Sequence, residues 1–577
     1  MTQQTTRRRL RALGAGIGLA LAMTAMASPT TNAAKVSAPT QGGDITVGIF
    51  NQLLSTCFSP NAANSALGVM RTVYEGLVEQ RADGKIVPYL AESITPSADY
   101  KTWTIGLRSG VTFHDGTPMN VQAVVTNLQA IRGLTASALG RHTLGSGIPL
   151  VANIKDVRPA SATAVTIELW NGQKDFDEWL YASGRFFMRS LSTLGNAQLC
   201  ATSGKGTGPF MFQSVSPTEV KVVRNPNYWR KDKNGVQLPY LNSITFKYVN
   251  QAAQRVNGLK SGTLDAAGFT SAGEIKQIVN VQANKNVSTI SSPDDYYAMN
   301  MFNTAIAPFN NKNARLAVAH AFDIDTFYQQ RNCFKGKCIG TKPTSMVGKR
   351  NIMYNEAGFV TFDLAKAKKY VAAYKADTGQ DLAFSLPTDT SADSQANSKA
   401  FAQIMKKAGI TVTIATEDTA TITAKAFPTP GTGLNPYQMY PTTLFEGTGA
   451  YFVLPFIQSN TFRAPGINIA AVVGAANAPT FLAFGALINP GRFSDPAQDT
   501  LVWTAEFDTT GTRVKNLKAV TKFMQENANV LPVPTIQYTY GFSKKLAGYD
   551  KFILASGGQG RAMTNAGPNW TGVYIQN

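Results

Sequence analysis

Histidine, cysteine and charged residues are all scarce in this chain of 577 residues. It contains three histidines and four cysteines, and only 15% of its residues are charged. Three histidines exclude a histidine-rich metal site, and the Cys-x4-Cys spacing of Cys333 and Cys338 has no histidine nearby to complete a zinc site. We therefore expect neither a metal site nor a cofactor.

Enzyme motifs are also missing. No Gly-x-Ser-x-Gly elbow supports a hydrolase. The run Gly206–Pro209 resembles a phosphate loop, but no Lys-Ser/Thr ending follows it and Pro209 removes an N–H donor. His114 and Asp115 lead into a turn and a helix that we expect Thr117 to cap, so we interpret the pair as scaffold. The sequence thus predicts no catalytic residue and no enzyme.

Long apolar segments are absent apart from one short run near the start. Four arginines between residues 7 and 11 precede the apolar run Leu13–Ala25, and small residues follow. About a dozen residues cannot span a bilayer as a helix, whereas this order is typical of a secretory signal. We predict a signal peptide over residues 1–34, cleaved after Ala27 or Ala34, and leave the general and twin-arginine export routes open.

The cysteines bear on the destination of the protein. The first is Cys57, too far from the apolar run to carry a lipid anchor. We therefore expect an exported protein of the periplasmic or extracellular cell-envelope space. An even number of cysteines in an exported chain favours disulfides. Cys333 and Cys338 bracket a short loop with a glycine and are the expected pair, which leaves Cys57 with Cys200 by elimination.

The formal net charge is +19, and removal of the four signal-peptide arginines leaves +15. A basic balance is compatible with nucleic acid, an anionic ligand or the anionic cell envelope. The lysines and arginines are spread along the chain rather than clustered, and an exported protein rarely meets nucleic acid. We interpret the charge as a solvated basic surface and expect no nucleic-acid partner.

The length exceeds what one hydrophobic core usually fills, so at least two globular lobes are expected. In the first part, apolar residues predict a buried strand at 44–50 and alternate as in a half-buried strand at 102–108. The apolar residues between Val121 and Ile131 fall on one helical face. This part is therefore predicted to be mixed α and β.

A second kind of unit appears later in the chain. Alternating apolar residues at 382–386 are followed by a helical stripe at 400–408 and by a second alternating run at 410–414. Strand, helix and strand at this spacing predict a βαβ unit and a parallel sheet covered by helices. The region from about 296 to 530 is thus expected to form a separate α/β lobe.

Short motifs follow one another in a defined order between about residues 44 and 550, and each is weak alone. They are Tyr74–Val78, Pro88–Ser93, Trp103–Arg108, Val111–Asn120, Gly206–Phe210, Arg224–Trp229, Ser261–Asp265, Asn303, Pro308-Phe309, Arg315, Leu531–Pro534 and Gly548-Tyr549. In this order and spacing the chain resembles the extracytoplasmic solute-binding proteins of ATP-binding-cassette (ABC) importers, in the oligopeptide, dipeptide and nickel-binding group (family 5).

The resemblance implies an α/β, two-lobed, periplasmic-binding-protein-like clamp that closes by hinge motion. The first lobe would comprise residues 36–290, with an extra subdomain at about 60–200, and the returning segment 532–577. The second lobe would comprise residues 291–531. The two hinge-crossing strands would be Tyr296–Phe302 and Pro532–Tyr538, and the ligand would bind in the cleft between the lobes.

The charged anchors that the resemblance implies for a short peptide are in doubt. Peptide-binding members hold the amino terminus with an Asp in a loop that corresponds to Thr442–Tyr451, where Thr448 replaces it and Glu446 could serve instead. The segment corresponding to the carboxylate-binding arginine, Leu386–Ser391, contains no arginine. The sequence contains no histidine after His320, which argues against the nickel-binding branch. A longer peptide bound through its backbone needs fewer charged anchors.

We therefore predict a receptor for a peptide or similar small solute that works with an ABC permease and its ATPase subunits. It would contact the membrane peripherally, through the permease, and we expect a monomer. An oligosaccharide receptor on the same scaffold, a non-transport envelope sensor or chaperone, and, last, an enzyme remain as alternatives. By loop position, the expected ligand contacts are Asn51, Gln52, Phe58, Thr207, Tyr440, Glu446, Thr448 and Tyr538.

Overall fold

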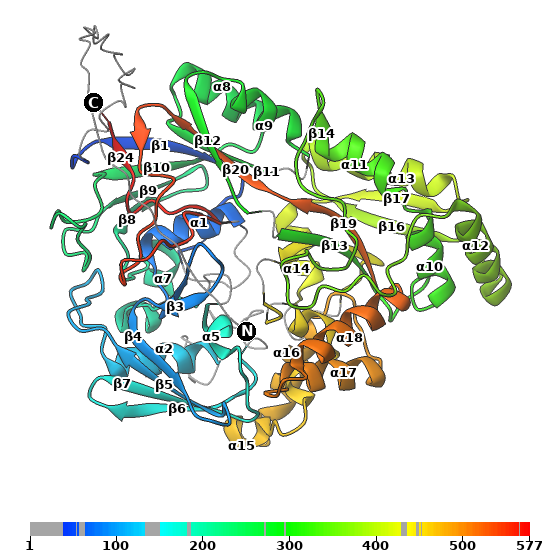
Figure 1. Ribbon diagram of the computed structural model, residues 1–577, viewed down its shortest axis with the longest axis horizontal. Helices are drawn as coiled ribbons and strands as arrows, with labels where there is room; N and C mark the ends of the chain where they lie inside the picture. Colours follow the sequence, from blue (N-terminus) through cyan, green and yellow to red (C-terminus); the bar gives the residue numbers. More distant parts are fainter. Residues whose placement is uncertain are drawn as a thin grey trace, which may run out of the picture. The chain divides into compact units, whose positions relative to one another are not determined.

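The computed structural model describes residues 39–53, 55–56, 64–132, 151–181, 186–270, 273–293, 296–428, 435–445, 449–451, 453–564 and 566–576. The predicted signal peptide lies outside these residues. The elements described below all belong to the contact-rich unit Pro39–Asn577. Figure 1 gives their arrangement.

A seven-stranded sheet organises the first part of this unit. Its strand order is β12-β20-β11-β1-β10-β9-β8. The predicted strand at 44–50 is confirmed: Ile45, Val47 and Ile49 are buried in β1, which lies parallel to both neighbours, β10 and β11. The strands are β1 (Asp44–Ile49), β8 (Phe210–Val215), β9 (Glu219–Arg224), β10 (Ser243–Tyr248), β11 (Ala266–Thr270), β12 (Val287–Ser291) and β20 (Tyr538–Ser543).

A smaller antiparallel sheet has the strand order β4-β5-β7-β6. Its strands are β4 (Ala91–Pro96), β5 (Thr102–Leu107), β7 (Ala164–Leu169) and β6 (Ile154–Ser161). The alternation predicted at 102–108 is confirmed, because Trp103, Ile105 and Leu107 are buried in β5. These side chains join a core to which α2 (Val121–Ile131) and α5 (Phe176–Tyr181) also contribute.

The predicted helix start at Thr117 is wrong. Helix α2 begins at Val121, and its N-cap is Asn120, whose side chain accepts a hydrogen bond from the Ala123 N–H. Thr117 instead belongs to a turn, where its hydroxyl donates to the Asp115 carboxylate. Thr and Asn are both good N-cap residues. Which of the two caps the helix is therefore decided by where the chain leaves the turn.

The second part contains the predicted βαβ unit. Strands β16 (Ala383–Thr388) and β17 (Thr411–Thr416) pair in parallel, and α13 (Ala392–Lys406) connects them. A three-stranded antiparallel sheet lies beside it, with β13 (Tyr296–Phe302) between β18 (Met439–Phe445) and β19 (Val530–Ile536). The α/β character predicted for 296–530 is confirmed.

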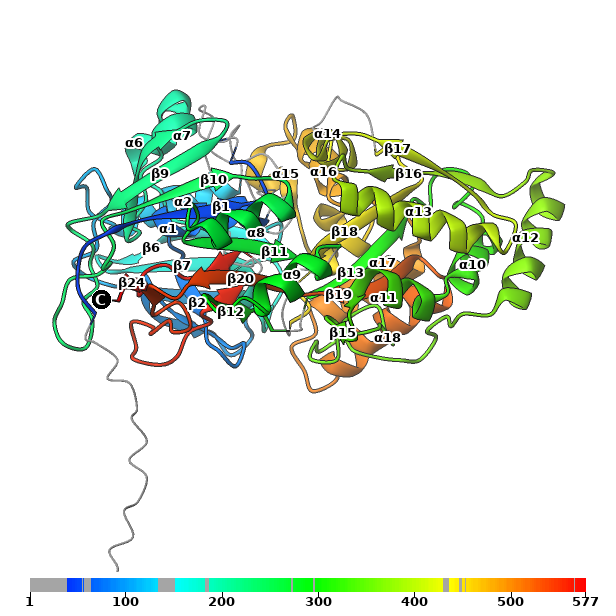
Figure 2. The same ribbon diagram turned by 90° about the horizontal axis from the view of Figure 1, so that it is seen from above.

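Helices surround these sheets. In Figures 1 and 2, α8 and α9 lie beside the seven-stranded sheet, and α10, α12 and α13 lie around β16 and β17. The remaining helices are α1 (Asn64–Val73), α6 (Leu191–Leu194), α7 (Ala197–Ser203), α8 (Ala252–Ser261), α9 (Ile275–Gln282), α10 (Lys312–Ala321), α11 (Ile324–Asn332), α12 (Leu364–Thr378), α14 (Thr419–Ala426), α15 (Ile469–Val473), α16 (Ala478–Leu487), α17 (Pro496–Glu506) and α18 (Arg513–Glu526), with 3-10 turns at Leu454–Ile457 and Thr461–Arg463.

Short two-stranded ladders complete the fold. One of them, β14 (Cys333–Phe334) with β15 (Lys337–Cys338), is closed by the predicted disulfide between Cys333 and Cys338. Cys200 is also disulfide-bonded, but Cys57 lies outside the described residues, so that pairing stays a prediction. The other ladders are β2 (Val78–Gln80) with β3 (Ile86–Pro88), β21 (Leu546–Ala547) with β24 (Tyr574–Ile575), and β22 (Met563–Thr564) with β23 (Gly567–Pro568).

The chain passes between the large sheet and the three-stranded sheet twice. It leaves β12 and enters β13, and later it leaves β19 and enters β20 with only Gln537 between the two strands. The two passages are bonded to each other. The Ser292 N–H donates to the Tyr538 carbonyl at 2.8 Å, and the Gln537 side chain donates to the Ser292 carbonyl at 2.9 Å.

Candidate ligand-binding site

Aromatic side chains gather where the two passages meet. Tyr538 packs edge-on against Tyr296 with ring centroids 5.6 Å apart, and it stacks on Phe50 at 6.5 Å. Tyr538 and Tyr296 are buried. Phe50 directly follows β1, so the loop that begins at Asn51 starts beside this junction. The junction is therefore a packed aromatic contact from which the first loop extends.

Glu75, within the Tyr74–Val78 motif, is a buried carboxylate at the centre of a polar network. Oε1 accepts from the Tyr228 hydroxyl at 2.6 Å, and Oε2 accepts from the Trp229 indole at 3.0 Å and from the Thr207 hydroxyl at 2.9 Å. Burial raises the pKa of Glu75, and these hydrogen bonds oppose the rise. Arg230 adds a nearby positive charge.

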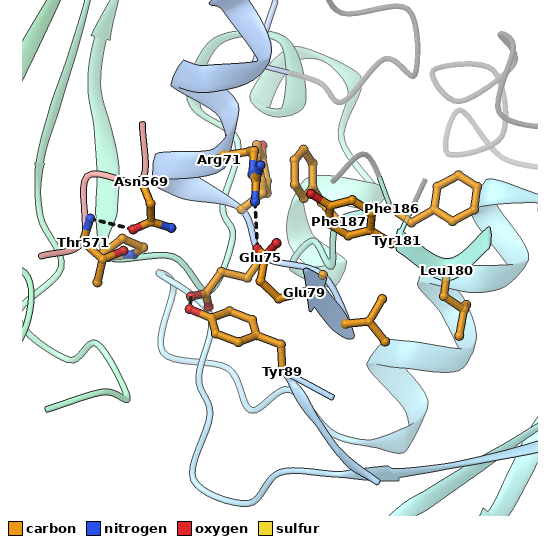
Figure 3. A pocket seen from close by; sticks show the side chains of 14 residues that line it. Arg71, Glu75, Glu79, Tyr89, Leu180, Tyr181, Phe186, Phe187, Asn569 and Thr571 are labelled. Atoms are coloured by element: carbon orange, nitrogen blue, oxygen red, sulfur yellow. Dashed lines mark hydrogen bonds and ion pairs between the residues drawn. The ribbon is translucent and has the colours of Figure 1, made fainter. Parts of the chain in front are cut away.

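A pocket opens beside Glu75 (Figure 3). It is narrow, with room for water-sized groups rather than for a solute. Across it, Arg71 pairs with Glu79 at 2.8 Å. Since the network is satisfied internally, this part of the motif series holds the scaffold together rather than a ligand.

His114 and Asp115 are also scaffold, as predicted. The His114 ring lies between the Gly206 N–H and the Gly208 carbonyl, at 3.2 and 2.9 Å, and burial lowers its pKa to about 4. Burial alone would raise the pKa of Asp115, but hydrogen bonds, among them one from Ser192 at 2.6 Å, bring it down to about 2.

A different set of charged groups joins α5 to the last two long helices of the second part. Asp175, just before α5, forms a buried ion pair with Arg513 at the start of α18, 2.5 Å apart. These residues are 9% and 8% exposed. Glu506 at the end of α17 is buried as well. Nearby in the chain from α5, the Asn171 side chain donates to the Pro465 carbonyl at 2.8 Å. Segments more than 290 residues apart thus meet here.

Acids outnumber cations in this contact. Burial raises the pKa of Glu178 well above its usual range, with further contributions from the negative charges of Asp175 and Asp177. Burial likewise raises the pKa of Glu506 to about 8 and that of Asp177 to about 6. Arg513 is the cation that offsets these effects for Glu178 and Glu506. We name Asp175, Asp177, Glu178 and Glu506 with Arg513 the α5 charge cluster.

The ligand contacts predicted from loop position lie in several places. Gln52 donates to the Pro217 carbonyl at 2.6 Å, and Thr207 is fully buried against Glu75. Tyr440 in β18 packs edge-on against Phe427. The structure therefore commits these three side chains to contacts within the protein. Tyr538 packs in the aromatic junction with Phe50 and Tyr296, and Asn51 follows Phe50 in the chain. Phe58, Glu446 and Thr448 lie outside the described residues, so their role stays a prediction.

The α5 charge cluster was missed from the sequence. A usable sign exists: residues 175–181 read Asp-Phe-Asp-Glu-Trp-Leu-Tyr, which places three acids among apolar and aromatic residues. Such acids are rarely buried without partners. Their partner Arg513, however, is 338 positions away from Asp175, and no local pattern connects the two.

The described residues offer neither a metal site nor a membrane span. They contain no group of three or more His, Cys, Asp or Glu side chains arranged to hold a metal ion. None of their helices combines the length and the apolar content needed to cross a membrane.

The large sheet and the three-stranded sheet, joined by two passages, give the fold that is found in the two-lobed periplasmic binding proteins. The fold is similar to that of AgaA from A. tumefacien, solved in complex with agropinic acid (TM-score 0.74, 21% identity, 93% of this chain and 99% of that one). It is also similar to that of the oligopeptide-binding protein AppA from Bacillus subtilis, solved with a nonapeptide (TM-score 0.71, 16% identity, 94% and 100%).

Sequence comparison gives the family. The model of "Bacterial extracellular solute-binding proteins, family 5 Middle" matches residues 85–445, and the chain belongs to this family. It is 29% identical over 304 residues to the nickel-binding periplasmic protein of Escherichia coli, covering 52% of this chain and 54% of that one. It is 29% identical over 271 residues to the glutathione-binding protein GsiB of the same species, covering 46% and 50%. The match thus spans about half the length of these relatives.

Proposed function

We propose that this protein is the extracytoplasmic substrate-binding component of an ABC importer. It takes a peptide or a similar small solute between two lobes and delivers it to a membrane permease that works with ATPase subunits. Family membership over residues 85–445 carries the proposal. The relatives that match over half their length are a nickel-binding protein and a glutathione-binding protein.

The lobes of this proposal follow the two passages. The resemblance assigns residues 36–290 and 532–577 to the first lobe and residues 291–531 to the second. Residues 532–536, however, belong to β19 and pair with β13 of the second part, so we put the hinge at Ser292 and Gln537, where the passages are hydrogen-bonded. Hinges that join two lobes through a few residues between strands support closure around a ligand. The signal-like residues 1–34 support export to the cell-envelope space, where such a receptor works as a monomer.

Two observations bear on the ligand class. The described residues contain no cluster of side chains that could hold a metal ion. This disfavours a bare metal ion as the solute. Similar folds were solved with a nonapeptide and with agropinic acid, so the scaffold accepts organic solutes of different kinds. A peptide is the first choice.

Native mass spectrometry of protein purified from its own host tests the proposal. We expect bound solutes that leave on denaturation and whose masses form a peptide ladder. Hexose-spaced masses would replace the peptide assignment by a sugar. If the protein carries no solute and none of a broad set of peptides raises its melting temperature, the receptor function is wrong.

A further inference from the structure

A short hairpin of the second part lies next to the hinge. It consists of β14 and β15, and the disulfide between Cys333 and Cys338 joins paired positions of its two strands. Two-stranded hairpins are only marginally stable in water on their own. The disulfide therefore keeps this hairpin formed and fixes the start of the segment that follows it, which begins with Ile339.

The base of the hairpin is bonded to β19, the strand that leads into the hinge. The Thr341 N–H donates to the Thr535 hydroxyl at 2.6 Å, and the Thr535 N–H donates to the Thr341 carbonyl at 3.0 Å. The neighbouring Gly340 has a φ of +82°, and a Cβ atom there would lie 2.5 Å from the Thr535 carbonyl oxygen. Since Thr535 stands two residues before Gln537, the hairpin belongs to the second part directly at the hinge.

The same segment also touches the first part. Ile339 packs against an apolar core cluster of the first part, whose buried members lie between Ala252 and Val287 in α8, α9, β11, β12 and the loop after α8. Strand β14 lies beside α9 as well (Figure 1). Residues 333–341, which we name the hairpin segment, thus connect the two parts in addition to the two passages of the chain.

A third connection beside a hinge restricts rotation. Rotation at Ser292 and Gln537 needs changes in only a few backbone torsions. The bonds between Thr341 and Thr535 hold the hairpin segment to β19, so rotation would pull Ile339 away from the apolar cluster. Loss of apolar contact is unfavourable in water. The hairpin segment therefore favours the angle of this structure, in which the two parts also meet through Asp175 and Arg513.

We propose that the hairpin segment holds the two lobes at the closed angle, with Ile339 as its contact to the first lobe and the Cys333–Cys338 disulfide as the bond that keeps it rigid. The inference rests on the proposed receptor function and adds a control of closure to it. The apparent affinity for a solute falls in proportion to the fraction of molecules in the binding-competent, closed state. Loosening the hairpin segment should thus weaken the binding of all solutes alike.

The test compares five full-length proteins. They are the wild type, Ile339→Ser, the double variant Cys333→Ser with Cys338→Ser, and two controls. Ile339→Val keeps an apolar side chain at the contact, and Lys337→Ala changes an exposed residue of the same hairpin. Ile339→Ser leaves the disulfide in place, so it decides the question by itself if the double variant does not fold.

Fluorescence energy transfer reports the angle between the lobes without any solute. The dyes are attached through p-acetylphenylalanine at Glu92 of β4 and Lys522 of α18, which are exposed positions of the two parts, and the cysteines stay untouched. We expect a longer mean distance between the dyes in Ile339→Ser and in the double variant, whereas both controls should match the wild type. Equal distances in all five proteins would overturn the proposal.

Binding is measured with the solute pool that denaturation releases from wild-type protein purified from its host. Ile339→Ser and the double variant should bind this pool about three- to tenfold more weakly, with the same order of preference among its masses. Weaker binding of some masses only would mean that Ile339 contacts the solute, which contradicts the proposal. If the wild type releases no solute, the receptor function is wrong, and the dye distances still decide whether the hairpin segment sets the angle.

Discussion

At the scale of single residues, Glu75 illustrates a buried charge that the protein satisfies by itself. Its carboxylate accepts from Tyr228, Trp229 and Thr207. Glu75→Ala would leave these donors without their acceptor and remove the negative charge near Arg230, so we expect a loss of about 3 kcal/mol in the free energy of unfolding. Urea unfolding measures it. Glu92→Ala, at an exposed position of β4, should stay within about 0.5 kcal/mol, and an equal effect of both variants would contradict the network.

Glu506 gives the protein a pH dependence. Its pKa rises from 4.5 to about 8 on burial, with the nearby charge of Asp175 as the second cause. An acid whose pKa is raised in the folded state stabilises the fold below pH 4.5 and loses this contribution as the pH rises to about 8. The free energy of unfolding should therefore fall over this range, by at most about 1.4 kcal/mol per pH unit from this group.

The measurement is a series of urea titrations between pH 5 and pH 8. Glu506→Gln should give a flatter dependence than the wild type, although Asp177 and Glu178, whose pKa values are also raised, keep part of the slope in both proteins. Parallel curves would show that Glu506 does not carry a proton in the folded state.

Site residues were the least predictable part of the molecule. Motif position correctly marked His114 and Asp115 as scaffold, because a turn signal stood next to them. Motif position also predicted Thr207 as a ligand contact, but its hydroxyl is bonded to Glu75. It did not indicate Glu178. The environment of Glu178 is made by Gly449 and Arg513, which only the tertiary fold brings near, so residue type and spacing could not reveal it.

At the scale of elements, the start of α2 provides a direct test of capping. The Asn120 side chain accepts from the Ala123 N–H at 3.0 Å. Asn120→Ala should cost about 1 kcal/mol, read from chemical denaturation. Gln122→Ala, on the exposed side of the same helix, should change little. A larger loss for Gln122→Ala would argue against the cap.

Strands and helices with a clear apolar period were predictable, and their ends were less so. The alternation at Trp103, Ile105 and Leu107 matches β5 because one face of that sheet is buried. The βαβ unit was visible for the same reason. The helix start at Thr117 failed because Thr117 and Asn120 are both competent caps, and the hydrogen bond from Thr117 to Asp115 holds the former in the turn.

At the scale of the whole molecule, the ion pair between Asp175 and Arg513 ties together segments from the two predicted lobes. Arg513→Met would leave Asp175, Glu178 and Glu506 without a nearby cation, and we expect a cost of about 3–5 kcal/mol. Asp175→Asn should cost less, because it also removes one negative charge from an acid-rich cluster. Denaturant unfolding of both variants shows which substitution lowers the free energy of unfolding more.

A double-mutant cycle completes this prediction. The two substitutions together should cost less than the sum of the single ones, with a coupling of about 1–3 kcal/mol. Lys522→Met serves as the control, since Lys522 is an exposed cation of the same helix. Strict additivity would mean that the pair contributes nothing to holding the segments together.

The two-lobed organisation was predictable because many weak motifs occur in one order, and order over several hundred residues reflects the fold more than any single motif does. The contact between α5 and α17–α18 was not predictable. It depends on how the two parts meet, and no periodicity within either part encodes that.

The position of β20 has a consequence for how the protein is made. In the described sheet, β12 is an edge strand and β20 lies between it and β11. Residues 538–543 must therefore leave the ribosome before the sheet that began with residue 44 can close. Until then β11 and β12 expose unpaired backbone edges, which favour aggregation. Synthesis of the chain thus leaves the large sheet incomplete until residues 538–543 can pair with β11 and β12.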